Sequence, residues 1–579
     1  MQSHPIQRRR CLRLAPAVSI SLTFLLTGMV STVAEAYAPP AKADRLQWWR
    51  EARFGLFLHW GPVSLKGTEI SWSRANSNPH CPNKGKIPVE VYDNLYKEFN
   101  PTKFNAREWV QVVGEAGMKY VVLTAKHCDG FCLWPTRVID HHIGKSPFRR
   151  DICGELATAV HRAGLRLGWY YSPMDWFDPD CRRELNTDYV KRMQAQLHEL
   201  LTDYGRIDLL WFDWDGGTIP WDQKNTYRLV RGLQPQIIIN NRLDCSRGGF
   251  RADRYIGPNA DYYTPEQVIG KYDDRRPWET CMTLGTQWAW KPNDRIKSVK
   301  ECIRILVQCV GGDGNLLLNT GPMPDGRIEP RQVEVLQGIG AWLKKYGQSI
   351  YGTRGGPWKP GSYGAATRKD RTIYVHIFEW LDGPVQLPAL PGKILCSQLL
   401  TGGTVKVNQS DTVVEIIVPK EQRRDIDTIV QLELDRDTGE IPTIVARNAN
   451  SLTYNAQATA SNVYSKMREF GPEYAVDGDD LTRWATDGEA RQAWLEVDLG
   501  RPRRIDRALI SEAFPMRVQK FELQYWNDAD WKTFYRGATI GKRWTVSFAP
   551  ITARRIRLNV LDSSLGPTIW EFQLFEPIK

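Results

Sequence analysis

The 579-residue chain predicts a multidomain α/β plus all-β protein: a (β/α) TIM-like barrel, a small β-sandwich, and a second β-sandwich at the C-terminus. Two observations support this fold class. From residue 45 to about 350, apolar runs alternate with helical stretches, as in parallel βα units. After Gly352, short alternating strands are separated by Gly, Pro and Asn turns, as in antiparallel sandwiches. At roughly 100–200 residues per domain, the length fits three domains.

Residues 1–36 are predicted to be an export signal. Four arginines between residues 8 and 13 precede the apolar run "LAPAVSISLTFLLTGMV", and "AEA" at 34–36 is a small-x-small cleavage site. We expect cleavage after Ala36, or after Ala38, and a periplasmic or secreted protein with a signal of bacterial style. The paired arginines also match a twin-arginine route weakly. No other run of about 18 apolar residues occurs, so no transmembrane helix is expected.

The predicted barrel, residues 37–352, contains seven apolar strand candidates. They lie at 53–61, 119–127, 166–172, 208–214, 237–242, 279–285 and 315–321. Nearly continuous apolar runs are typical of parallel strands that are covered on both faces. Predicted helices precede the second, third and fourth of these strands, at 104–117, 151–164 and 187–205, and each ends at a glycine.

The rest of the chain predicts two all-β domains. The first, residues 353–440, contains alternating runs such as "TVKVNQSDTVVEIIVP". The second, residues 441–579, contains "WLEVDLG", "FELQYW" and "ARRIRLNVL". The net charge of +11 is spread along the chain without a Lys/Arg run interleaved with aromatics, so no nucleic-acid partner is expected. The 23 tryptophans and 22 tyrosines suit sugar stacking, or the interiors of large domains.

Polar side chains follow five of the predicted strands. The strand ends present His59, Lys126 and His127, Tyr170 and Tyr171, Asp213, and Arg242. Barrel enzymes assemble their active sites from the carboxyl ends of several strands. Each residue alone has an ordinary structural explanation, but five converging ends favour a functional site. We therefore expect Lys126 and His127 to point into a shared pocket.

Asp213 is the central candidate, because it follows the apolar run "LLWF". Partial burial disfavours its charge, and Arg242, His59 or His127 would restore it. An ionised carboxylate in a Trp-rich pocket suits glycoside hydrolysis, where it can attack the anomeric carbon. Asp215 is a weaker candidate on the same strand end.

Glycoside hydrolysis needs a second carboxyl group as the acid/base. Glu266 follows the fifth strand on a loop, from which it could reach the leaving oxygen, whereas Glu279 begins a strand and is the reserve. A zinc hydrolase using His59, His127 and Asp213 is the competing chemistry. It is disfavoured because the chain has no H-x-H or H-E-x-x-H spacing.

Residues 45–350 resemble the α-L-fucosidases of glycoside hydrolase family 29. The resemblance rests on "RFGLFLHWG", "MKYVVLTAKHCDGF", "GWYYSPMDW", "LLWFDWDG", "INNR", "DYYTPEQ", "RPWETCMTLGTQWAW" and "GNLLLNTGPMPDG". It implies a retaining mechanism without a cofactor, in which Asp213 is the nucleophile. It also implies sugar contacts in the pocket: His59 and His127 to hydroxyls, Trp288 to the methyl group, and Trp72, Tyr171 and Arg242 as further lining.

Two features refine the resemblance. The family usually has two successive histidines where this chain has His127 and Cys128, so one sugar contact is lost or moved. "TPEQ" resembles the branch in which this glutamate, here Glu266, is the proton donor, with Glu279 in reserve. That branch is selective for α-1,3 and α-1,4 linkages on Lewis-type glycans.

The C-terminal segment resembles a discoidin-type (coagulation factor C-type) domain through "AVDGDDLTRWATDG", "WLEVDLG" and "FELQYW". Such a turn often contains a structural calcium, which here would involve Asp477, Asp480 and Thr482, since hard cations prefer oxygen ligands. The alternative is a plain hydrogen-bonded turn. The domain is also a candidate carbohydrate-binding module.

Together these observations predict a retaining exo-α-L-fucosidase that releases terminal fucose from fucosylated oligosaccharides or glycoconjugates. Two alternatives remain. One is a retaining barrel glycosidase that acts on another sugar, such as α-galactose, and the other is a catalytically silent glycan-binding protein. The presence of Asp213 and both glutamates favours an enzyme over the silent protein.

Overall fold

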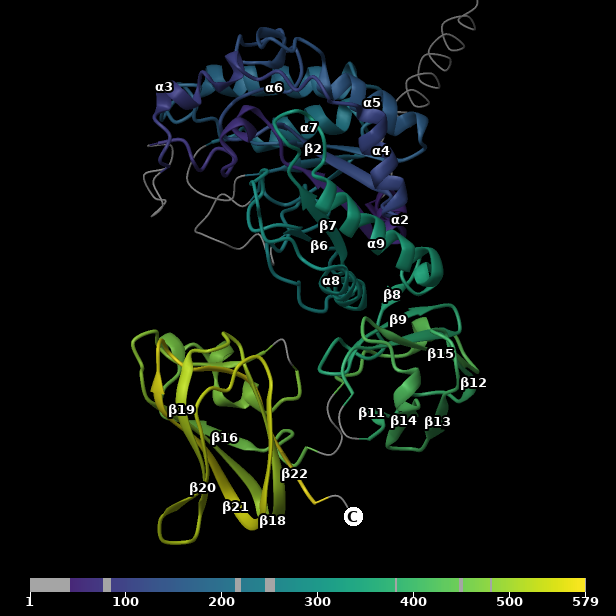
Figure 1. Ribbon diagram of the computed structural model, residues 1–579, viewed down its shortest axis with the longest axis vertical. Helices are drawn as coiled ribbons and strands as arrows, with labels where there is room; N and C mark the ends of the chain where they lie inside the picture. The colour runs from purple at the N-terminus through teal and green to yellow at the C-terminus, as the bar shows by residue number, and fades with distance from the viewer. Residues whose placement is uncertain are drawn as a thin grey trace, which may run out of the picture.

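The structure is a computed structural model that describes residues 42–75, 85–213, 220–244, 256–380, 383–446, 451–479 and 482–577. The predicted export signal, Asp215 and Asp480 lie outside these residues. Three units follow one another along the chain: a unit built on a parallel sheet, a middle β unit and a C-terminal β unit (Figure 1). None of the described helices is long and apolar enough to cross a membrane.

All seven predicted strands of the first unit form. They are β1 (Phe54–Leu58), β2 (Tyr120–Lys126), β3 (Arg166–Tyr171), β4 (Leu209–Phe212), β5 (Ile238–Ile239), β6 (Glu279–Thr283) and β7 (Asn315–Thr320). Their order in the sheet is β5-β4-β3-β2-β1-β7-β6, and every pairing is parallel. Parallel strands end at the same edge of a sheet, so this order gathers their carboxyl ends.

The sheet is curled, and an irregular segment connects its two outer strands. The backbone N–H of Asp261 donates to Ile239 at 2.8 Å, and the N–H of Glu279 donates to Tyr263 at 3.0 Å. Isolated parallel bridges at Tyr262 and Tyr263 accompany these bonds. The predicted parallel βα sheet is therefore confirmed as a curled sheet, and no eighth regular strand occurs within the described ranges of this unit.

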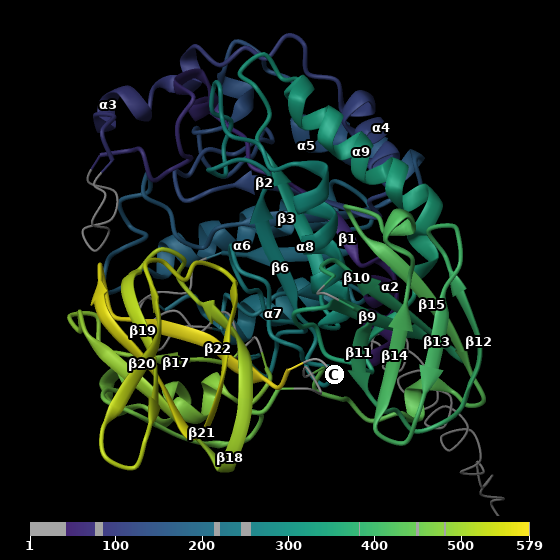
Figure 2. The ribbon, with the colours of Figure 1, turned by 60° about the horizontal axis from the view of Figure 1, so that its bottom comes forward.

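Helices cover the outer face of the curled sheet (Figure 1, Figure 2). They are α4 (Ala106–Glu115), α5 (Ile152–Arg162), α6 (Thr187–Thr202), α7 (Gln223–Leu233), α8 (Val299–Gly311) and α9 (Pro330–Tyr346). Helix α2 (Lys42–Ala52) instead packs Leu46 and Trp49 against the residues inside the curl, and α3 (Val89–Tyr92) belongs to a separate small cluster through Tyr92. Side-chain caps start several of the helices: Asn105 accepts from the second residue of α4, and Asp151 caps α5. The predicted stop at Gly164 follows α5 with a φ of 69°, which glycine adopts without strain.

Two hydrophobic clusters separate the interior of the curl from its outer face. The inner cluster takes alternate residues from every strand, for example Phe57, Tyr170, Trp211 and Leu317. The outer cluster takes the residues between them and packs against the helices. Since successive side chains of a strand point to opposite faces, neighbouring residues enter different clusters.

The middle unit contains two antiparallel sheets that share one hydrophobic cluster. The five-stranded sheet comprises β8 (Arg354–Gly355), β9 (Gly364–Lys369), β10 (Thr372–Ile377), β12 (Ile394–Leu399) and β15 (Thr428–Leu434). The three-stranded sheet comprises β11 (Val385–Pro388), β13 (Lys406–Gln409) and β14 (Val413–Ile417).

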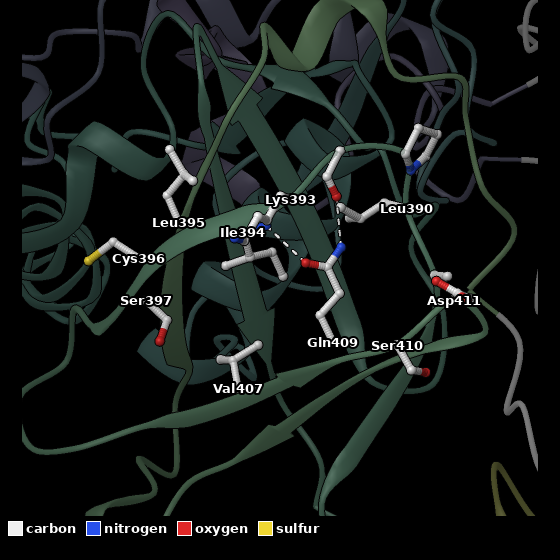
Figure 3. A pocket seen from close by; sticks show the side chains of 13 residues that line it. Leu390, Lys393, Ile394, Leu395, Cys396, Ser397, Val407, Gln409, Ser410 and Asp411 are labelled. Carbon is white, nitrogen blue, oxygen red and sulfur yellow. Dashed lines mark hydrogen bonds between the residues drawn. The ribbon is translucent and has the colours of Figure 1, made fainter.

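A pocket of about 890 Å³ lies beside β12 and β13 (Figure 3). There the Gln409 side chain accepts a hydrogen bond from the Ile394 backbone N–H and donates one to the Gly392 carbonyl. The pocket includes none of the predicted site residues.

The C-terminal unit is all-β. Its strands are β16 (Gln457–Ala460), β17 (Trp484–Ala485), β18 (Ala493–Glu512), β19 (Val518–Trp526), β20 (Trp531–Gly537), β21 (Trp544–Ser563) and β22 (Thr568–Phe575). They enclose their own hydrophobic cluster. This unit lies beside the middle unit (Figure 1, Figure 2), and the Arg543 guanidinium donates to the Ser362 carbonyl at 3.1 Å.

Candidate active site

Arg242 brings the two predicted catalytic carboxylates together. Its Nη1 lies 2.8 Å from Asp213 Oδ1, and its Nη2 lies 2.8 Å from Glu266 Oε2. Asp213 directly follows β4, while Glu266 lies in the segment between β5 and β6, shortly after the bridging residues Tyr262 and Tyr263. The Arg242 side chain is 6% exposed, against 24% for Asp213 and 39% for Glu266. Both carboxylates are therefore accessible to a ligand, and the cation between them is buried.

The guanidinium and Asp213 are fixed by further contacts. Arg242 Nε donates to Thr264 Oγ1 at 2.9 Å, and the guanidinium lies 4.6 Å from the centre of the Trp211 ring. Burial alone would lower the pKa of Arg242, but Glu266 and Asp213 reverse that effect and raise it. The second oxygen of Asp213 accepts from the Tyr170 hydroxyl at 2.6 Å. These bonds leave Asp213 in one orientation.

His59 and His127 lie on the same side of the curl as Tyr170. The ring centres of the two histidines are 5.7 Å apart, and the His127 ring stacks on Tyr170 at 5.2 Å. Burial lowers the pKa of both imidazoles, that of His127 to about 3 with a further contribution from Lys126. Both histidines are therefore neutral at physiological pH, and they can bind hydroxyl groups through neutral hydrogen bonds.

The two predicted aromatic residues have different surroundings. The Trp288 ring lies 4.7 Å from the His59 ring, so Trp288 belongs to the pocket. Trp72 packs edge-on against Trp176 at 5.1 Å, on the segment next to the pocket residue Ser71.

The sequence prediction missed Glu69. Its carboxylate accepts from the backbone N–H of Trp288 at 2.9 Å and of Ala289 at 3.2 Å. Burial raises the pKa of Glu69, and the Glu266 charge raises it further. Glu69 therefore anchors the Trp288 loop close to Glu266. The only sequence signal was its position in "EISWSR", two residues before Ser71.

Tyr171 was predicted to line the pocket, but it points away from it. Its hydroxyl donates to Gln196 of α6 at 2.6 Å, on the outer face of the sheet. The neighbouring Tyr170 occupies the inner face and contacts Asp213. Adjacent strand residues cannot both face inward, and the double tyrosine gave no basis for choosing between them.

Lys126 was also predicted to enter the shared pocket, and it too faces outward. The Lys126 Nζ lies 2.8 Å from Asp175. Burial alone would lower the pKa of Lys126, but the Asp175 carboxylate outweighs this effect and the pKa is raised. The cause of the outward orientation is a β-bulge at Ala125: Thr124 pairs with Tyr170 and Lys126 pairs with Tyr171. The extra residue reverses the alternation, so that Lys126 faces outward and His127 faces the pocket.

We expect Lys126→Met to destabilise the protein by roughly 3–5 kcal/mol, because it leaves Asp175 as a buried carboxylate without its cation. Both side chains of this pair are at most 3% exposed. Lys145→Met is the matched control, since Lys145 pairs with Asp140 at the surface and the pair contributes under about 1 kcal/mol. Urea unfolding of both variants measures the difference. Equal losses would show that Lys126 is not an essential partner of Asp175.

Glu279, the reserve acid/base, lies away from the other site residues. It begins β6, at the amino end of the strands, and accepts from Tyr120 at 2.5 Å and from Trp49 of α2 at 3.2 Å. It is fully buried, which raises its pKa from 4.5 to about 7. These contacts place Glu279 at the opposite end of the curl from Asp213.

Glu279 should make stability depend on pH. Its folded-state pKa lies above its unfolded value, so its contribution is fully present below pH 4.5 and is lost as the pH rises through about 7. The loss amounts to roughly 3 kcal/mol by the linkage relation. Glu279→Gln, which keeps an acceptor for Tyr120, should unfold with less change across this range. A variant as pH-dependent as the parent would show that another group is responsible.

Cys128, which follows His127 in the sequence, is buried next to the site. Its sulfur lies 3.1 Å from the Ser172 hydroxyl, and that hydroxyl also lies 3.2 Å from the Asp213 carbonyl oxygen. Burial raises the pKa of the Cys128 thiol. The thiol therefore supports the backbone behind Asp213 as a neutral group.

The predicted calcium turn is described only in part, because Asp480 lies outside the described residues. The Thr482 hydroxyl lies 2.7 Å from Asp477 Oδ2, and the Asp479 N–H donates to Asp477 Oδ1 at 3.0 Å. Both carboxylate oxygens thus engage hydrogen-bond donors. In the described part of the chain, no three His, Cys, Asp or Glu side chains gather as metal ligands. These contacts fit the hydrogen-bonded turn, and calcium stays a prediction.

Comparison with known proteins identifies the family. Residues 30–348 match the family model "Alpha-L-fucosidase", and residues 457–572 match "F5/8 type C domain", which confirms the discoidin-type resemblance. Human plasma alpha-L-fucosidase is 31% identical over 58% of this chain and 76% of its own length. Alpha-L-fucosidase isoenzyme 1 from Paenibacillus thiaminolyticus is 33% identical with a TM-score of 0.61, covering 68% of this chain and all of that one.

A third similar structure is an alpha-L-fucosidase GH29 from Bacteroides thetaiotaomicron, trapped as a covalent intermediate with 2-fluoro-fucosyl fluoride in a Glu-to-Gln mutant. It is 26% identical, with a TM-score of 0.61, and covers 68% of this chain and 97% of its own. The matching region includes the curled sheet and every residue of the carboxylate–guanidinium cluster. The chain therefore belongs to the alpha-L-fucosidase family, which is a family of glycoside hydrolases.

Proposed function

We propose that this protein is a retaining exo-α-L-fucosidase that releases terminal α-L-fucose from glycans. The observation that supports this most strongly is the position of Asp213 and Glu266 on the two ends of one buried guanidinium. Glycoside hydrolysis requires two carboxyl groups that flank the scissile bond, and these two are partly exposed at the carboxyl ends of the strands.

In the proposed reaction, Asp213 attacks the anomeric carbon while Glu266 donates a proton to the leaving oxygen. The bond to the aglycone breaks, and a covalent fucosyl ester forms on Asp213. Glu266, now ionised, then takes a proton from water, whose oxygen attacks the anomeric carbon and releases Asp213. Two displacements restore the original configuration. The trapped intermediate of the Bacteroides relative supports this sequence of steps.

We propose α-1,3- and α-1,4-linked fucose on branched, Lewis-type glycans as the substrate, on the basis of the "TPEQ" resemblance around Glu266. The N-terminal segment supports export to the periplasm or the medium. Neither catalytic step needs a group beyond the side chains of this chain and water.

The test measures free fucose released by the protein from residue 37 onward. One substrate is a Lewis-type oligosaccharide, and the other is an aryl α-L-fucoside. Release from the first alone supports the branched-linkage proposal. Release from both supports the fucosidase and contradicts the linkage preference. Binding of both without release contradicts the enzymatic proposal and indicates a glycan-binding protein.

A further inference from the structure

The two pocket histidines are each bound at Nδ1, which leaves Nε2 for a ligand. His59 Nδ1 contacts Asn319, and His127 Nδ1 contacts Ser71. In the described part of the chain, neither Nε2 atom has a hydrogen-bond partner. Neither is a fully buried atom without a partner, in contrast to the Nε2 of His376 in the middle unit, so a ligand can reach both. A neutral imidazole has one donor and one acceptor nitrogen, so the partner of Nδ1 decides what Nε2 offers.

Asn319 fixes the proton of His59 on Nδ1. The Asn319 Nδ2 donates to the Trp288 carbonyl at 2.8 Å, which turns Oδ1 toward His59 Nδ1 at 2.6 Å. An amide oxygen only accepts, so Nδ1 must donate. Burial lowers the pKa of His59 well below 6.5, so the ring has no second proton. Nε2 of His59 is therefore an acceptor.

Ser71 fixes the opposite arrangement on His127. The Ser71 Oγ accepts from the backbone N–H of Asp129 at 2.8 Å and lies 2.5 Å from His127 Nδ1. Within the described ranges, His127 is the only acceptor for the Ser71 proton. The hydroxyl therefore donates to Nδ1. The single proton of the neutral His127 ring is on Nε2, which is a donor.

The Ser71 hydroxyl is itself held rigidly. The backbone N–H of Ser71 donates to the Tyr92 hydroxyl at 2.8 Å, and Tyr92 donates to Asp129 at 2.8 Å. Ser71 adopts a φ of 59°, which is uncommon for a residue other than glycine. Such strain persists only where the surroundings fix the residue, and it is common beside ligand sites.

We infer that Asn319 and Ser71 are positioning residues that give His59 and His127 opposite tautomers, so that the pocket presents an acceptor next to a donor. A hydroxyl group satisfies both nitrogens at once, because it donates one hydrogen bond and accepts another. A carboxylate, which only accepts, or an ammonium, which only donates, satisfies one. The inference rests on the proposed function only for the identity of this hydroxyl as one of fucose.

The first test needs no substrate, so it is independent of the proposed activity. Protein containing ¹⁵N-labelled histidine is examined by two-bond ¹H–¹⁵N NMR, which distinguishes an Nδ1–H ring from an Nε2–H ring. The signals are assigned by their absence in His59→Asn and His127→Asn. We expect an Nδ1–H ring for His59 and an Nε2–H ring for His127 between about pH 6 and 8. The same tautomer in both rings would overturn the inference.

The second test removes the Ser71 hydroxyl. Ser71→Gly accommodates the positive φ, and we expect the His127 signals to shift to a mixture of tautomers and kcat/KM on an α-L-fucoside to fall about tenfold. Ser73→Gly is the matched control, because the Ser73 hydroxyl donates to the Glu69 carbonyl and not to a histidine. An unchanged His127 tautomer in Ser71→Gly would overturn the role of Ser71.

The third test uses Asn319→Asp, which keeps the acceptor oxygen but adds a negative charge. The charge should raise the His59 pKa, and a protonated ring loses its acceptor. We expect kcat/KM to rise with pH as His59 deprotonates, a dependence that the parent enzyme lacks. A pH-independent loss would indicate a merely structural Asn319. If neither protein releases fucose, the proposed function fails, and the NMR spectra still decide the tautomers.

Discussion

Asp213→Asn should lower kcat on an aryl α-L-fucoside by roughly three orders of magnitude or more, because an amide cannot form the glycosyl ester at a useful rate. The variant keeps an oxygen that can accept from Tyr170 or Arg242, so fucose should still bind. Steady-state kinetics measure the first effect, and titration calorimetry with fucose measures the second. Retention of a tenth of the activity would contradict the assignment of Asp213.

Asp208→Asn is the matched control for this experiment. Asp208 lies immediately before β4, at the other end of the same strand, and pairs with Arg166 at 2.8 Å. The same amide substitution there should leave kcat within about twofold. A second variant, Asp213→Gly, tests the mechanism with added azide. If Asp213 is the nucleophile, azide attacks in its place and yields the β-fucosyl azide, in a single displacement with inversion.

Glu266→Gln has the second largest expected effect, and its size should depend on the leaving group. On an oligosaccharide, whose leaving alcohol needs a proton, kcat/KM should fall about 10²–10⁴-fold. On a dinitrophenyl fucoside, whose leaving group departs as a stable anion, kcat/KM should change by less than about tenfold. Comparing the two substrates separates a proton donor from a residue that merely positions the sugar.

Glu279→Gln is the matched control, since it makes the same substitution on the buried glutamate at the opposite end of the curl. It should change kcat/KM little on both substrates. If Glu279→Gln showed the leaving-group dependence and Glu266→Gln did not, the acid/base assignment would have to be exchanged. That result would also require a large rearrangement around Trp49.

The sequence predicted the parts of the site that depend on strand ends. The apolar runs identified all seven strands, and Asp213, His59 and Arg242 follow strands in the order that the parallel sheet requires. Asp213 and Arg242 then form an ion pair across neighbouring strand ends. These predictions succeeded because the run of apolar residues that marks a buried strand can be recognised from a short stretch of the chain.

The parts that failed depend on one-residue details or on distant partners. The bulge at Ala125 has no signature in "VVLTAKH", yet it decides which of Lys126 and His127 faces the pocket. Glu69 and Asn319 act through residues more than 200 positions away, the backbone of Trp288 and the ring of His59. Spacing along the chain gives no access to such contacts.

The bulge at Ala125 also determines how this segment tolerates changes in length. Val122 and His127 both face inward although they are five positions apart, an odd separation that strict alternation would place on opposite faces. The alternation must therefore be interrupted once between them, and the bulge at Ala125 supplies that interruption. Deleting Ala125 would restore strict alternation and would keep Lys126 on the outer face and His127 on the inner face, because Thr124 and Lys126 already pair with consecutive residues of β3. Inserting one residue while the bulge remains would exchange the two faces. Substitutions at Ala125 that preserve chain length leave both faces unchanged, so the segment tolerates changes in residue type and the loss of the bulge residue itself.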